Sequence, residues 1–388
     1  MSQHHTPADL ATELADLTAL AREFFTKEVV PRHEEFAAAG EPDRALYRRA
    51  GELGLLGMSV PEEFGGGGGT FAHEAVLFRE QARSGELSMQ LGVHSGIVPH
   101  YLLAHATEAQ KKRWISKLVS GEWIGAIAMT EPGTGSDLQS ISTRAIRSGD
   151  EYLVTGAKTF ISNGATCDLL IIAVKTDPTQ GASGVSLLVA EVGENPPGFQ
   201  RGRKLKKIGQ KGQDTTELFF DGLRVPAENL LGGVEGQGFI QLMQQLPQER
   251  LIVGVAALGV VEAAYEHTLA YVRERHAFGK PLFALQNTRF EMADVATTVE
   301  VMRAFVERAI DRHVRGELDV KGAAMIKLWC SEQQNQVVDR CLQLHGGYGY
   351  MEEYPIAQLF VDGRIAKIYA GANEVMKDLI ARSLTAAV

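Results

Sequence analysis

Apolar residues recur every three or four positions near both ends of the chain, which is the spacing of one helix face. Leu10, Leu14 and Leu17 follow this spacing near the N-terminus, and it returns from Leu251 through Val272. Between residues 124 and 235 the pattern changes to short β-branched or aromatic runs separated by turn residues, which is typical of strands. The chain is therefore predicted to form helices, then strands, then helices.

The same patterns predict further individual elements. The helices are Asp43–Leu53, Ala72–Ala82, Thr107–Val119, Phe290–His313 and Ala323–Leu344, and the strands are Tyr152–Thr155, Leu169–Val174, Val185–Val189 and Glu217–Phe220. Thr107 is predicted to cap the helix that it opens, and Pro31 is predicted to break the first helix. The glycine run Gly65–Gly69 is of a kind that can cradle phosphate, but no strand–loop–helix unit surrounds it, which favours a flexible connector.

No helix is predicted between the strands, so the middle block is interpreted as an antiparallel β-domain and not as a nucleotide-binding βαβ sheet. We predict an α+β fold that is mainly α. Its domains are an N-terminal helical domain at residues 1–123, a central antiparallel β-domain at 124–235 and a C-terminal helical domain at 236–388. The chain has 388 residues, which is enough for two or three domains.

Composition excludes several classes of function. The net charge is −9, and an acidic surface without a basic tract argues against nucleic-acid binding. Cys167, Cys330 and Cys341 form no CxxC pair, so we expect no disulfide framework, no zinc ribbon and no other metal site. Residues 1–14 are polar, and the longest apolar run, Leu251–Val261, is shorter than the ~20 residues of a membrane span. A cytoplasmic protein without a transmembrane segment is predicted.

Two strings around the start of the β block are candidates for ligand contact. Met129–Asp137 combines glycines with hydroxyl side chains, which allows backbone amides to approach a ligand closely. An ordinary turn between helix and strand explains the same string equally well. Lys158–Gly164 places Phe160 beside hydroxyl residues, so the ring is either part of the core or packs on a flat cofactor.

Two further strings lie in the second helical block. Arg273–Lys280 is a basic cluster at a helix end, which either compensates the helix dipole or clamps a phosphate. His345–Tyr350 contains three glycines within four residues. A helix C-cap needs one glycine, so the other two favour close approach of the backbone to a ligand, while His345 itself is interpreted as structural.

Glu249 is the most unusual single residue. On a helix it shares a face with Val253, Ala256 and Val260, and the surrounding sequence is apolar almost all round, which predicts burial. A carboxylate is seldom buried without a partner or a task. From spacing alone, a structural salt bridge with an arginine such as Arg250 is slightly favoured over catalysis.

Together and in this order, these strings resemble the acyl-CoA dehydrogenase family over nearly the whole chain. The family fold has an N-terminal helical domain, a central β-domain and a C-terminal four-helix bundle, so the resemblance implies this architecture. It also implies FAD as cofactor, an acyl-CoA substrate and an electron-transfer flavoprotein as electron acceptor. Members are usually homotetramers, built as dimers of dimers, with FAD shared across a dimer interface.

The resemblance carries FAD-binding roles onto named residues. Those expected at the flavin are Ile127, Met129, Thr130, Gly135, Ser136, Phe160, Ile161, Ser162, Ala372 and Glu374. Those expected at FAD bound mainly by the neighbouring subunit are Arg275, Phe278, Gln286, Gln343, Leu344, Gly346 and Gly347. Many relatives have Trp in place of Phe160 and often Thr in place of Ala372, so a smaller stacking area and one hydroxyl contact fewer are expected here.

The catalytic base is expected at a different place from that of many relatives. Many members carry a glutamate directly after the tyrosine of an Ile-Tyr-Glu-Gly string, whereas this chain has Ala370 within Ile368–Gly371. Long-chain and isovaleryl-type members place the base on an earlier helix, just before an arginine, and Leu246–Leu251 resembles the long-chain version. The resemblance thus implies Glu249 as the general base. The substrate-binding residues that it implies are Ser136, Arg250, Tyr369 and Gly371.

His94–Val98 and Asn373–Lys377 also resemble long-chain members. The expected reaction is therefore FAD-dependent α,β-dehydrogenation of a medium- to long-chain fatty acyl-CoA to the trans-2-enoyl-CoA, in fatty acid β-oxidation. Three alternatives stay open at this point. They are a branched- or short-chain (isovaleryl-type) acyl-CoA dehydrogenase, a flavin oxidase of the same fold, and a non-enzymatic helical binding or scaffold protein.

Overall fold

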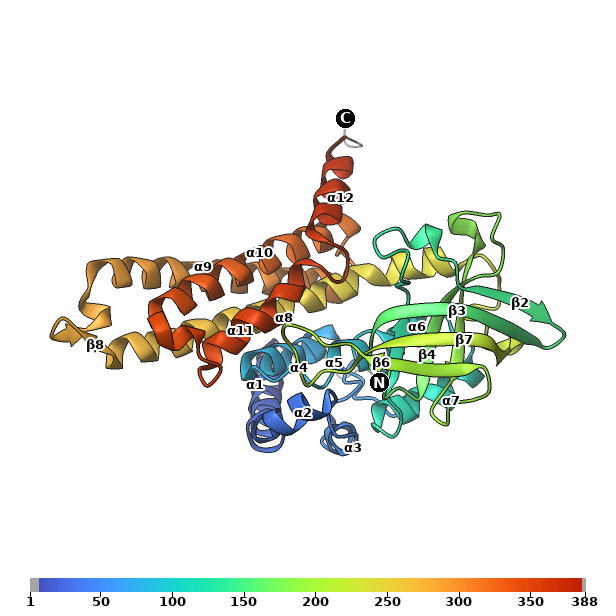
Figure 1. The fold of residues 1–388 in the computed structure, drawn as a ribbon, viewed down its shortest axis with the longest axis horizontal. Coiled ribbons are helices and arrows are strands. Elements are labelled where there is room, and N and C mark those ends of the chain that lie inside the picture. The colour runs from blue at the N-terminus through green and yellow to red at the C-terminus, as the bar shows by residue number, and fades with distance from the viewer. Residues whose placement is uncertain (1–6, 386–388) are drawn as a thin grey trace.

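The computed structural model describes residues 7–385, so residues 1–6 of the polar N-terminal segment and residues 386–388 lie outside the described residues. The first part of the chain is helical, as predicted. Its helices are α1 (Pro7–Phe24), α2 (His33–Ala39), α3 (Ala45–Glu52), α4 (Phe71–Ser84), α5 (Leu91–His94), α6 (Val98–His105) and α7 (Glu108–Val119). In Figure 1 they lie below and behind the other elements.

Of two local predictions for this region, the cap at Thr107 is confirmed and the helix break at Pro31 is wrong. Thr107 caps α7 and its hydroxyl accepts from the Gln110 amide, which confirms the predicted cap. The prediction for Pro31 is wrong, because α1 ends at Phe24 and the chain continues through a π turn into a 3₁₀ turn that contains the proline. Proline is tolerated there, since the first turn of a helix needs no donor from it.

The glycine run Gly65–Gly69 connects a short 3₁₀ turn to α4, but it is held in place. The amides of Gly67 and Gly69 donate to the carbonyls of Gly57 and Met58 at 3.1 and 2.8 Å. These bonds fold the loop back on the preceding segment, so the predicted connector is ordered where flexibility was expected.

The middle of the chain forms one sheet of seven strands. They are β1 (Gly125–Ala128), β2 (Arg144–Ser148), β3 (Glu151–Ser162), β4 (Leu169–Lys175), β5 (Val185–Glu191), β6 (Phe199–Lys204) and β7 (Thr215–Pro226). The order is β1-β4-β2-β3-β7-β6, and β5 pairs with β4. Most pairs are antiparallel, but β4 runs parallel to β1 and to β2, so the domain predicted as antiparallel contains a mixed sheet.

The strand β4 explains which strands could be seen in the sequence. All seven of its residues are buried. Leu170 and Ile172 pack into the core on one face, while Leu169 and Ile171 pack on the other face with side chains of α6 and α7. A strand covered on both faces is a continuous apolar run. The charged strands β2 and β6 give no such signal and were missed, as was the short apolar strand β1.

The last part of the chain is an elongated helical bundle, as Figure 1 shows. Its helices are α8 (Gly238–Glu274), α9 (Gln286–Val314), α10 (Val320–His345) and α11 (Pro355–Gly363), followed by α12 (Asn373–Thr385), which projects from the body. A small hairpin of β8 (His276–Ala277) and β9 (Lys280–Pro281) connects α8 to α9 at the end farthest from the sheet. The predicted fold class is confirmed, whereas the predicted boundaries at 123/124 and 235/236 stay predictions.

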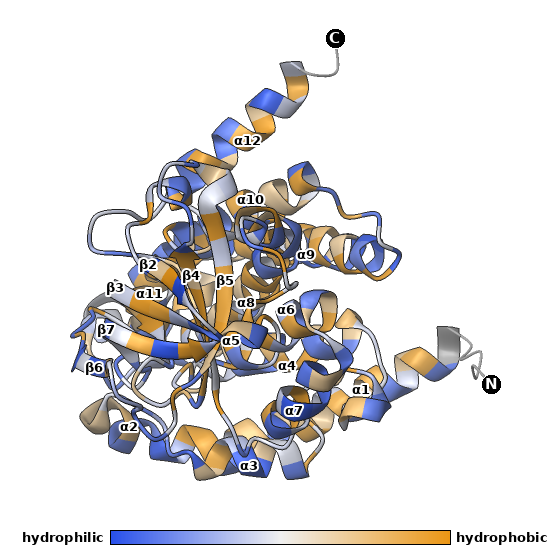
Figure 2. Cartoon of the chain, turned by 90° about the vertical axis from the view of Figure 1, so that its right-hand side faces the viewer, coloured by the Kyte–Doolittle hydropathy of each residue, from blue (hydrophilic) through white to orange (hydrophobic). Residues whose placement is uncertain are grey.

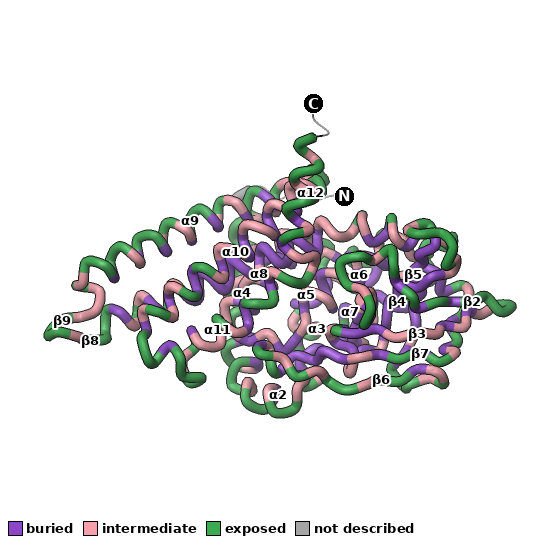
Figure 3. The backbone as a smooth tube through the Cα atoms, turned by 45° about the horizontal axis from the view of Figure 1, so that its top comes forward, coloured by how far each residue is buried: buried purple, intermediate pink, exposed green. Residues whose placement is uncertain are grey.

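The helix α8 is the central element of the bundle. It starts at Gly238, well before Leu251, and contains Pro247, which removes one backbone donor and bends a helix. By length and composition α8 alone among the described helices could cross a membrane, but 78% of its most apolar window is buried inside the protein. Figure 3 shows α8 mostly buried and α12 largely exposed, and Figure 2 shows how hydrophobic and hydrophilic residues alternate along the helices.

Candidate active site

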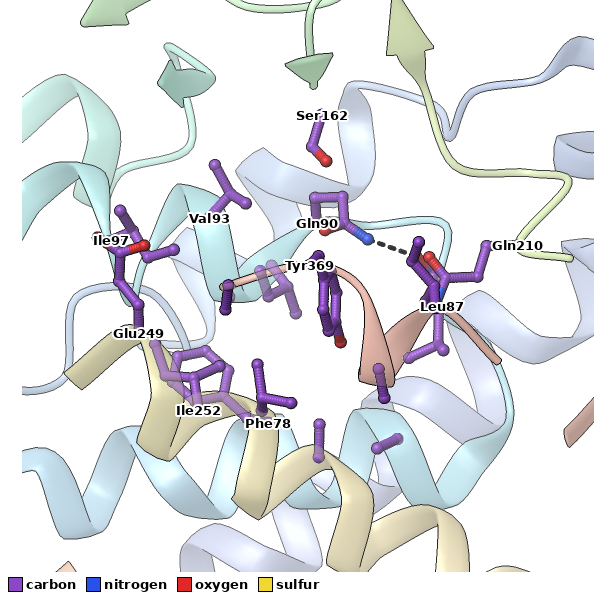
Figure 4. A pocket seen from close by; sticks show the side chains of 18 of the residues that line it. Phe78, Leu87, Gln90, Val93, Ile97, Ser162, Gln210, Glu249, Ile252 and Tyr369 are labelled. Carbon is purple, nitrogen blue, oxygen red and sulfur yellow. Dashed lines mark hydrogen bonds between the residues drawn. The ribbon is translucent and has the colours of Figure 1, made fainter. Parts of the chain in front are cut away.

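A cavity of about 310 Å³ lies where the three parts of the chain meet. Its walls come from α4, the segment before α6, the start of the sheet, α8 and the segment that precedes α12. Most of the side chains that line it are apolar, and Glu249 is an ionisable exception. Figure 4 shows that Glu249 and Tyr369 reach this cavity from different elements.

Glu249 lies on α8 shortly after Pro247, with 6% of its surface exposed. The Tyr101 hydroxyl donates to its Oε1 at 2.8 Å. Burial raises the pKa of Glu249 to about 7, and the hydrogen bond from Tyr101 and the charge of Arg250 oppose that rise. A carboxyl group that is close to half ionised at neutral pH is suited to take and return a proton.

Arg250 does not pair with Glu249. No described carboxylate lies within ion-pair distance of Arg250, and its buried Nε has no hydrogen-bond partner among residues 7–385. A Cβ built on Gly371 would lie 4.0 Å from its Nη2, so the side chain reaches under the turn before α12. The structural salt bridge favoured from spacing alone is therefore wrong.

The loop between β1 and β2 is fixed by a buried ion pair. Lys158 Nζ lies 2.9 Å from Glu131 Oε1 and also donates to the carbonyl of Met129. The second carboxylate oxygen of Glu131 accepts from the amide and the hydroxyl of Ser142. Burial raises the pKa of Glu131, but Lys158 and these hydrogen bonds outweigh it and bring the pKa to about 2. The loop is thus held beside the cavity by an ionised carboxylate.

Phe160 is unusual in both conformation and exposure. It has a φ of +60°, which is uncommon for a bulky residue, and 66% of its surface is exposed. The register of β3 against β7 shifts between Lys158 and Ile161, which turns Phe160 out of the sheet and towards the cavity that it lines. Strained backbone of this kind is concentrated at ligand sites.

The turn before α12 forms another wall. Tyr369, Ala370 and Gly371 line the cavity, and Ala370 has a left-handed φ of +52°. Its amide donates to no backbone carbonyl of the described chain. Lys327 Nζ donates to Asn373 Oδ1 at 2.7 Å and so anchors the end of this turn on α10. An amide without a backbone partner therefore belongs to a residue that lines the same cavity as Glu249.

Comparison with known proteins places this geometry in a family. Family models described as the N-terminal, middle and C-terminal domains of acyl-CoA dehydrogenase match residues 11–122, 126–223 and 236–385. The chain belongs to the acyl-CoA dehydrogenase family. It is therefore an FAD-dependent oxidoreductase that dehydrogenates acyl-CoA, and the alternative of a non-enzymatic scaffold is excluded.

The chain is similar to several named proteins. It is 46% identical over 365 residues to the long-chain specific acyl-CoA dehydrogenase, mitochondrial, of Rattus norvegicus, covering 94% of this chain and 84% of that protein. A crystal structure of acyl-CoA dehydrogenase from Geobacillus kaustophilus aligns with a TM-score of 0.93 at 44% identity, over 99% and 100% of the two chains. A structure titled as the electron transferring flavoprotein of Acidaminococcus fermentans aligns with a TM-score of 0.92 at 33% identity, over 99% of each chain.

The cavity fits the flavin part of FAD. The exposed ring of Phe160 offers a flat apolar surface, and the Thr130 hydroxyl has no partner among the described residues. At Gly135 a Cβ would meet only Thr130, at 3.9 Å, so this part of the loop leaves room for a ligand. In this acyl-CoA dehydrogenase, a ring system seated here would lie between the β-domain and Glu249.

The structure divides the expected site residues into three groups. The cavity gathers Ile127, Met129, Thr130, Gly135, Phe160, Ile161, Ser162, Glu249, Tyr369 and Gly371. A second, more open pocket gathers Arg275, Gln343, Leu344, Gly346 and Gly347. Neither pocket is lined by Ser136, Arg250, Phe278, Gln286, Ala372 or Glu374. Their predicted roles stay predictions.

The second pocket has the features of an anion site at the far end of the bundle. Arg275 lies over the ring of Tyr348 at 5.4 Å and pairs with no carboxylate among the described residues. At Gly346 and Gly347 an added Cβ would meet nothing within 4 Å. Along α8, Arg275 is ~39 Å from Glu249 at the usual helical rise. The two sets of expected FAD-binding residues therefore lie in two separate pockets of the subunit.

Sequence reasoning missed the residues that support the site. Tyr101 lies 148 residues before its partner Glu249 in the chain, and no local pattern connects two such positions. Glu131 and Lys158 lay inside two strings already singled out, but no local pattern shows that these strings meet. Lys327 and Asn373 likewise meet only because α10 and the turn before α12 pack together.

Proposed function

We propose that this enzyme acts on straight-chain acyl-CoA thioesters of medium to long chain, with Glu249 as the general base, within fatty acid β-oxidation. The observation that carries the proposal is the length of the apolar part of the cavity. Successive turns of α8 contribute Ile252, Val253, Ala256 and Val260 to its wall beyond Glu249.

The channel along α8 allows an estimate of acyl length. From Glu249 to Val260 the helix rises ~16 Å. An extended alkyl chain advances about 1.3 Å per methylene, given the usual C–C bond length. The channel therefore has room for about a dozen acyl carbons beyond the reacting centre. Phe78, Leu87 and Met89 also line the cavity and are apolar, which favours an alkyl chain over a polar acyl group.

The residues of the chain then divide the work. Glu249 removes the α-proton of the thioester, and its raised pKa makes it a stronger base than an exposed carboxylate. The amide of Ala370 donates to the thioester oxygen as negative charge develops on it, which needs no side chain. FAD, when bound, provides the acceptor for the β-hydride. Phe160 and Thr130 orient the ring and close the cavity to water.

The similarity to other family members supports the chain length and suggests partners. The relative that shares 46% of residues is named as long-chain specific, whereas isovaleryl-CoA dehydrogenases share 33–34%. An electron-transfer flavoprotein is proposed as the electron acceptor, supported by the structure with that title. A homotetramer, built as a dimer of dimers, is proposed, with the second pocket binding part of the FAD of a neighbouring subunit; the family resemblance and the separation of the two pockets support it. A cytoplasmic location is also proposed.

The test is a substrate panel in stopped-flow flavin reduction without oxygen. Butyryl-, octanoyl-, dodecanoyl-, hexadecanoyl- and isovaleryl-CoA are compared by the ratio of maximal rate to half-saturating concentration. The expected maximum is at the dodecanoyl or a neighbouring long member. A maximum at butyryl- or isovaleryl-CoA would overturn the chain-length proposal in favour of the short- or branched-chain alternative. Rapid peroxide formation in air without an acceptor would instead favour the oxidase.

A further inference from the structure

The hydroxyl of Tyr101 is committed to Glu249. Tyr101 lies on α6, is fully buried, and its Oη donates to Glu249 Oε1 at 2.8 Å. No other hydrogen bond is made by this hydroxyl within residues 7–385. A buried tyrosine hydroxyl usually needs a polar partner, and the one chosen here is the carboxylate at the centre of the cavity.

The two helices that carry the pair are clamped next to it. Gln248, the neighbour of Glu249, donates from Nε2 to the carbonyl of Gly96 at 2.7 Å, just before α6 begins. On its other side Gln248 Oε1 lies 2.9 Å from His313 Nε2 of α9. Adjacent residues of α8 are thus tied to the same stretch of chain, so the distance between Tyr101 and Glu249 is set by packed backbone.

The two oxygens of Glu249 are in different situations. Oε1 is held by Tyr101, whereas Oε2 has no hydrogen-bond partner among the described residues and is not among the buried atoms that lack one. Because Glu249 lines the cavity, the oxygen left over is the one that faces a ligand.

We propose that Tyr101 is a positioning residue for the base: its hydroxyl holds Oε1 and aims Oε2 at the α-carbon. In the step that it assists, the α C–H bond breaks, an O–H bond forms on Oε2, and the electron pair stays on the thioester as its enolate. The inference rests on the proposed function, since it needs Glu249 to be the base.

Among the titratable groups nearby, Tyr101 alone hydrogen-bonds to the carboxylate of Glu249 within residues 7–385. Among the described residues, the titratable side chains near Glu249 or lining the same cavity are Tyr101 and His100 of α6, Arg250 of α8, His313 of α9, Lys327 of α10, Asp362 of α11 and Tyr369 of the turn before α12. From α4 the cavity is faced by Phe78 and Gln81, which do not ionise. Burial and the adjacent carboxylate raise the pKa of Tyr101, so its hydroxyl keeps its proton and acts as a donor.

The sign of the effect follows from the donor. A hydrogen bond to the ionised form lowers a carboxyl pKa, and here Tyr101 opposes the burial that brings the pKa of Glu249 to about 7. Without the hydroxyl, the pKa rises further. A bond to a charged group corresponds to about one to two pH units. At pH 7 the ionised fraction would then fall roughly 5- to 50-fold.

The experiment uses Tyr101→Phe, with Tyr152→Phe as the matched control. Tyr152 is also buried and donates to a glutamate, Glu235, at 2.6 Å, but it lies in the β-domain away from the cavity. Two readouts are followed from pH 5.5 to 10 on the holoenzyme. The first is flavin reduction by dodecanoyl-CoA. The second is exchange of α-hydrogen with deuterated water in an acyl-CoA that has sulfur at the β position, which can lose a proton but no hydride.

For Tyr101→Phe the acid limb of both profiles should move to higher pH by about one to two units, with normal FAD content and with recovery at alkaline pH. Tyr152→Phe should keep the wild-type profile. A Tyr101→Phe profile that matches wild type, or one lowered equally at every pH, would overturn the inference. Glu249→Gln is measured in parallel. Wild-type rates of exchange and flavin reduction in Glu249→Gln would contradict the proposed function itself. This result distinguishes a failure of Glu249 as the base from a failure of Tyr101 as its positioning residue.

Discussion

The ammonium group of Lys158 and the carboxylate of Glu131 lie 2.9 Å apart in the interior, with 0% and 3% of the two side chains exposed. They lie beside the loop that carries Thr130 and Gly135, and Lys158 also donates to the Met129 carbonyl. Removing one partner leaves a buried charge without compensation. The pair therefore connects the stability of the β-domain to the shape of the flavin-facing loop.

Lys158→Met is expected to destabilise the protein by about 3–5 kcal/mol and to lower the FAD-to-protein ratio after gel filtration. The double variant Glu131→Gln/Lys158→Met should recover part of the thermal stability, because no charge is left unpaired. The measurement is the unfolding temperature of each variant with and without added FAD. A Lys158→Met enzyme that melts like wild type would show that the pair does not stabilise the fold.

Glu131 also predicts how the fold responds to acid. Its pKa is lowered from 4.5 to about 2 in the folded protein, so its contribution is complete above the unfolded-state value and is lost as pH falls from there towards 2. Wild type should therefore lose stability between pH 5 and pH 3, and Glu131→Gln, though weaker at pH 7, should lose less over that interval. Equal slopes of unfolding temperature against pH would contradict the assignment.

Several features of the fold could be predicted because local sequence determines them. The Thr107 cap and the strand Leu169–Lys175 depend on residues next to one another, and both were found. The apolar spacing from Leu251 to Val272 marked only part of α8, which begins at Gly238 and continues through Pro247, packed against α4 and α10. The parallel pairing of β1 with β4 has no local signal at all.

The candidate site was predictable only in part for a similar reason. Glu249 was visible as a charge on an apolar face, but spacing could not tell a salt bridge from a base. The structure decides against the salt bridge, because Arg250 extends towards Gly371 and the carboxylate is bonded by Tyr101 instead. Phe160 could be named, yet its exposed, left-handed conformation depends on a register shift in the sheet.

Ala256→Phe should shorten the acyl chains that the enzyme accepts. Ala256 lines the cavity about two turns beyond Glu249, and a phenyl ring there would fill the channel. We expect rates with hexadecanoyl-CoA to fall at least ~10-fold and rates with butyryl-CoA to change little, because a few blocked methylenes are each worth ~0.8 kcal/mol. Ala109→Phe, on the exposed face of α7, is the control. Unchanged use of hexadecanoyl-CoA would place the acyl chain elsewhere.

Arg275→Ala should weaken FAD retention and leave the fold intact. The guanidinium pairs with no carboxylate among the described residues, so its loss strands no buried partner, and a phosphate would lose a charged donor. Arg273→Ala is the matched control, since Arg273 lies at the same helix end but packs over Phe283. FAD content is measured by absorbance after dialysis, and subunit number by light scattering. A monomer that holds FAD tightly would contradict sharing between subunits.

The base itself can be moved. Glu249→Gln keeps the shape and the hydrogen bond to Tyr101 but removes the basic carboxylate, so flavin reduction should fall by roughly two to four powers of ten while FAD and acyl-CoA still bind. In that background Ala370→Glu should restore part of the rate. Ala370 lines the same cavity, and a carboxylate from its turn can approach the α-carbon from another wall. Recovery should be incomplete, since Ala370 already adopts a φ of +52° and the neighbouring side chains leave no space shaped for a longer one.

Flavin bleaching by a long-chain acyl-CoA without oxygen is the measurement. If Glu249→Gln alone bleaches at a near-normal rate, another group takes the proton and Glu249 serves the structure.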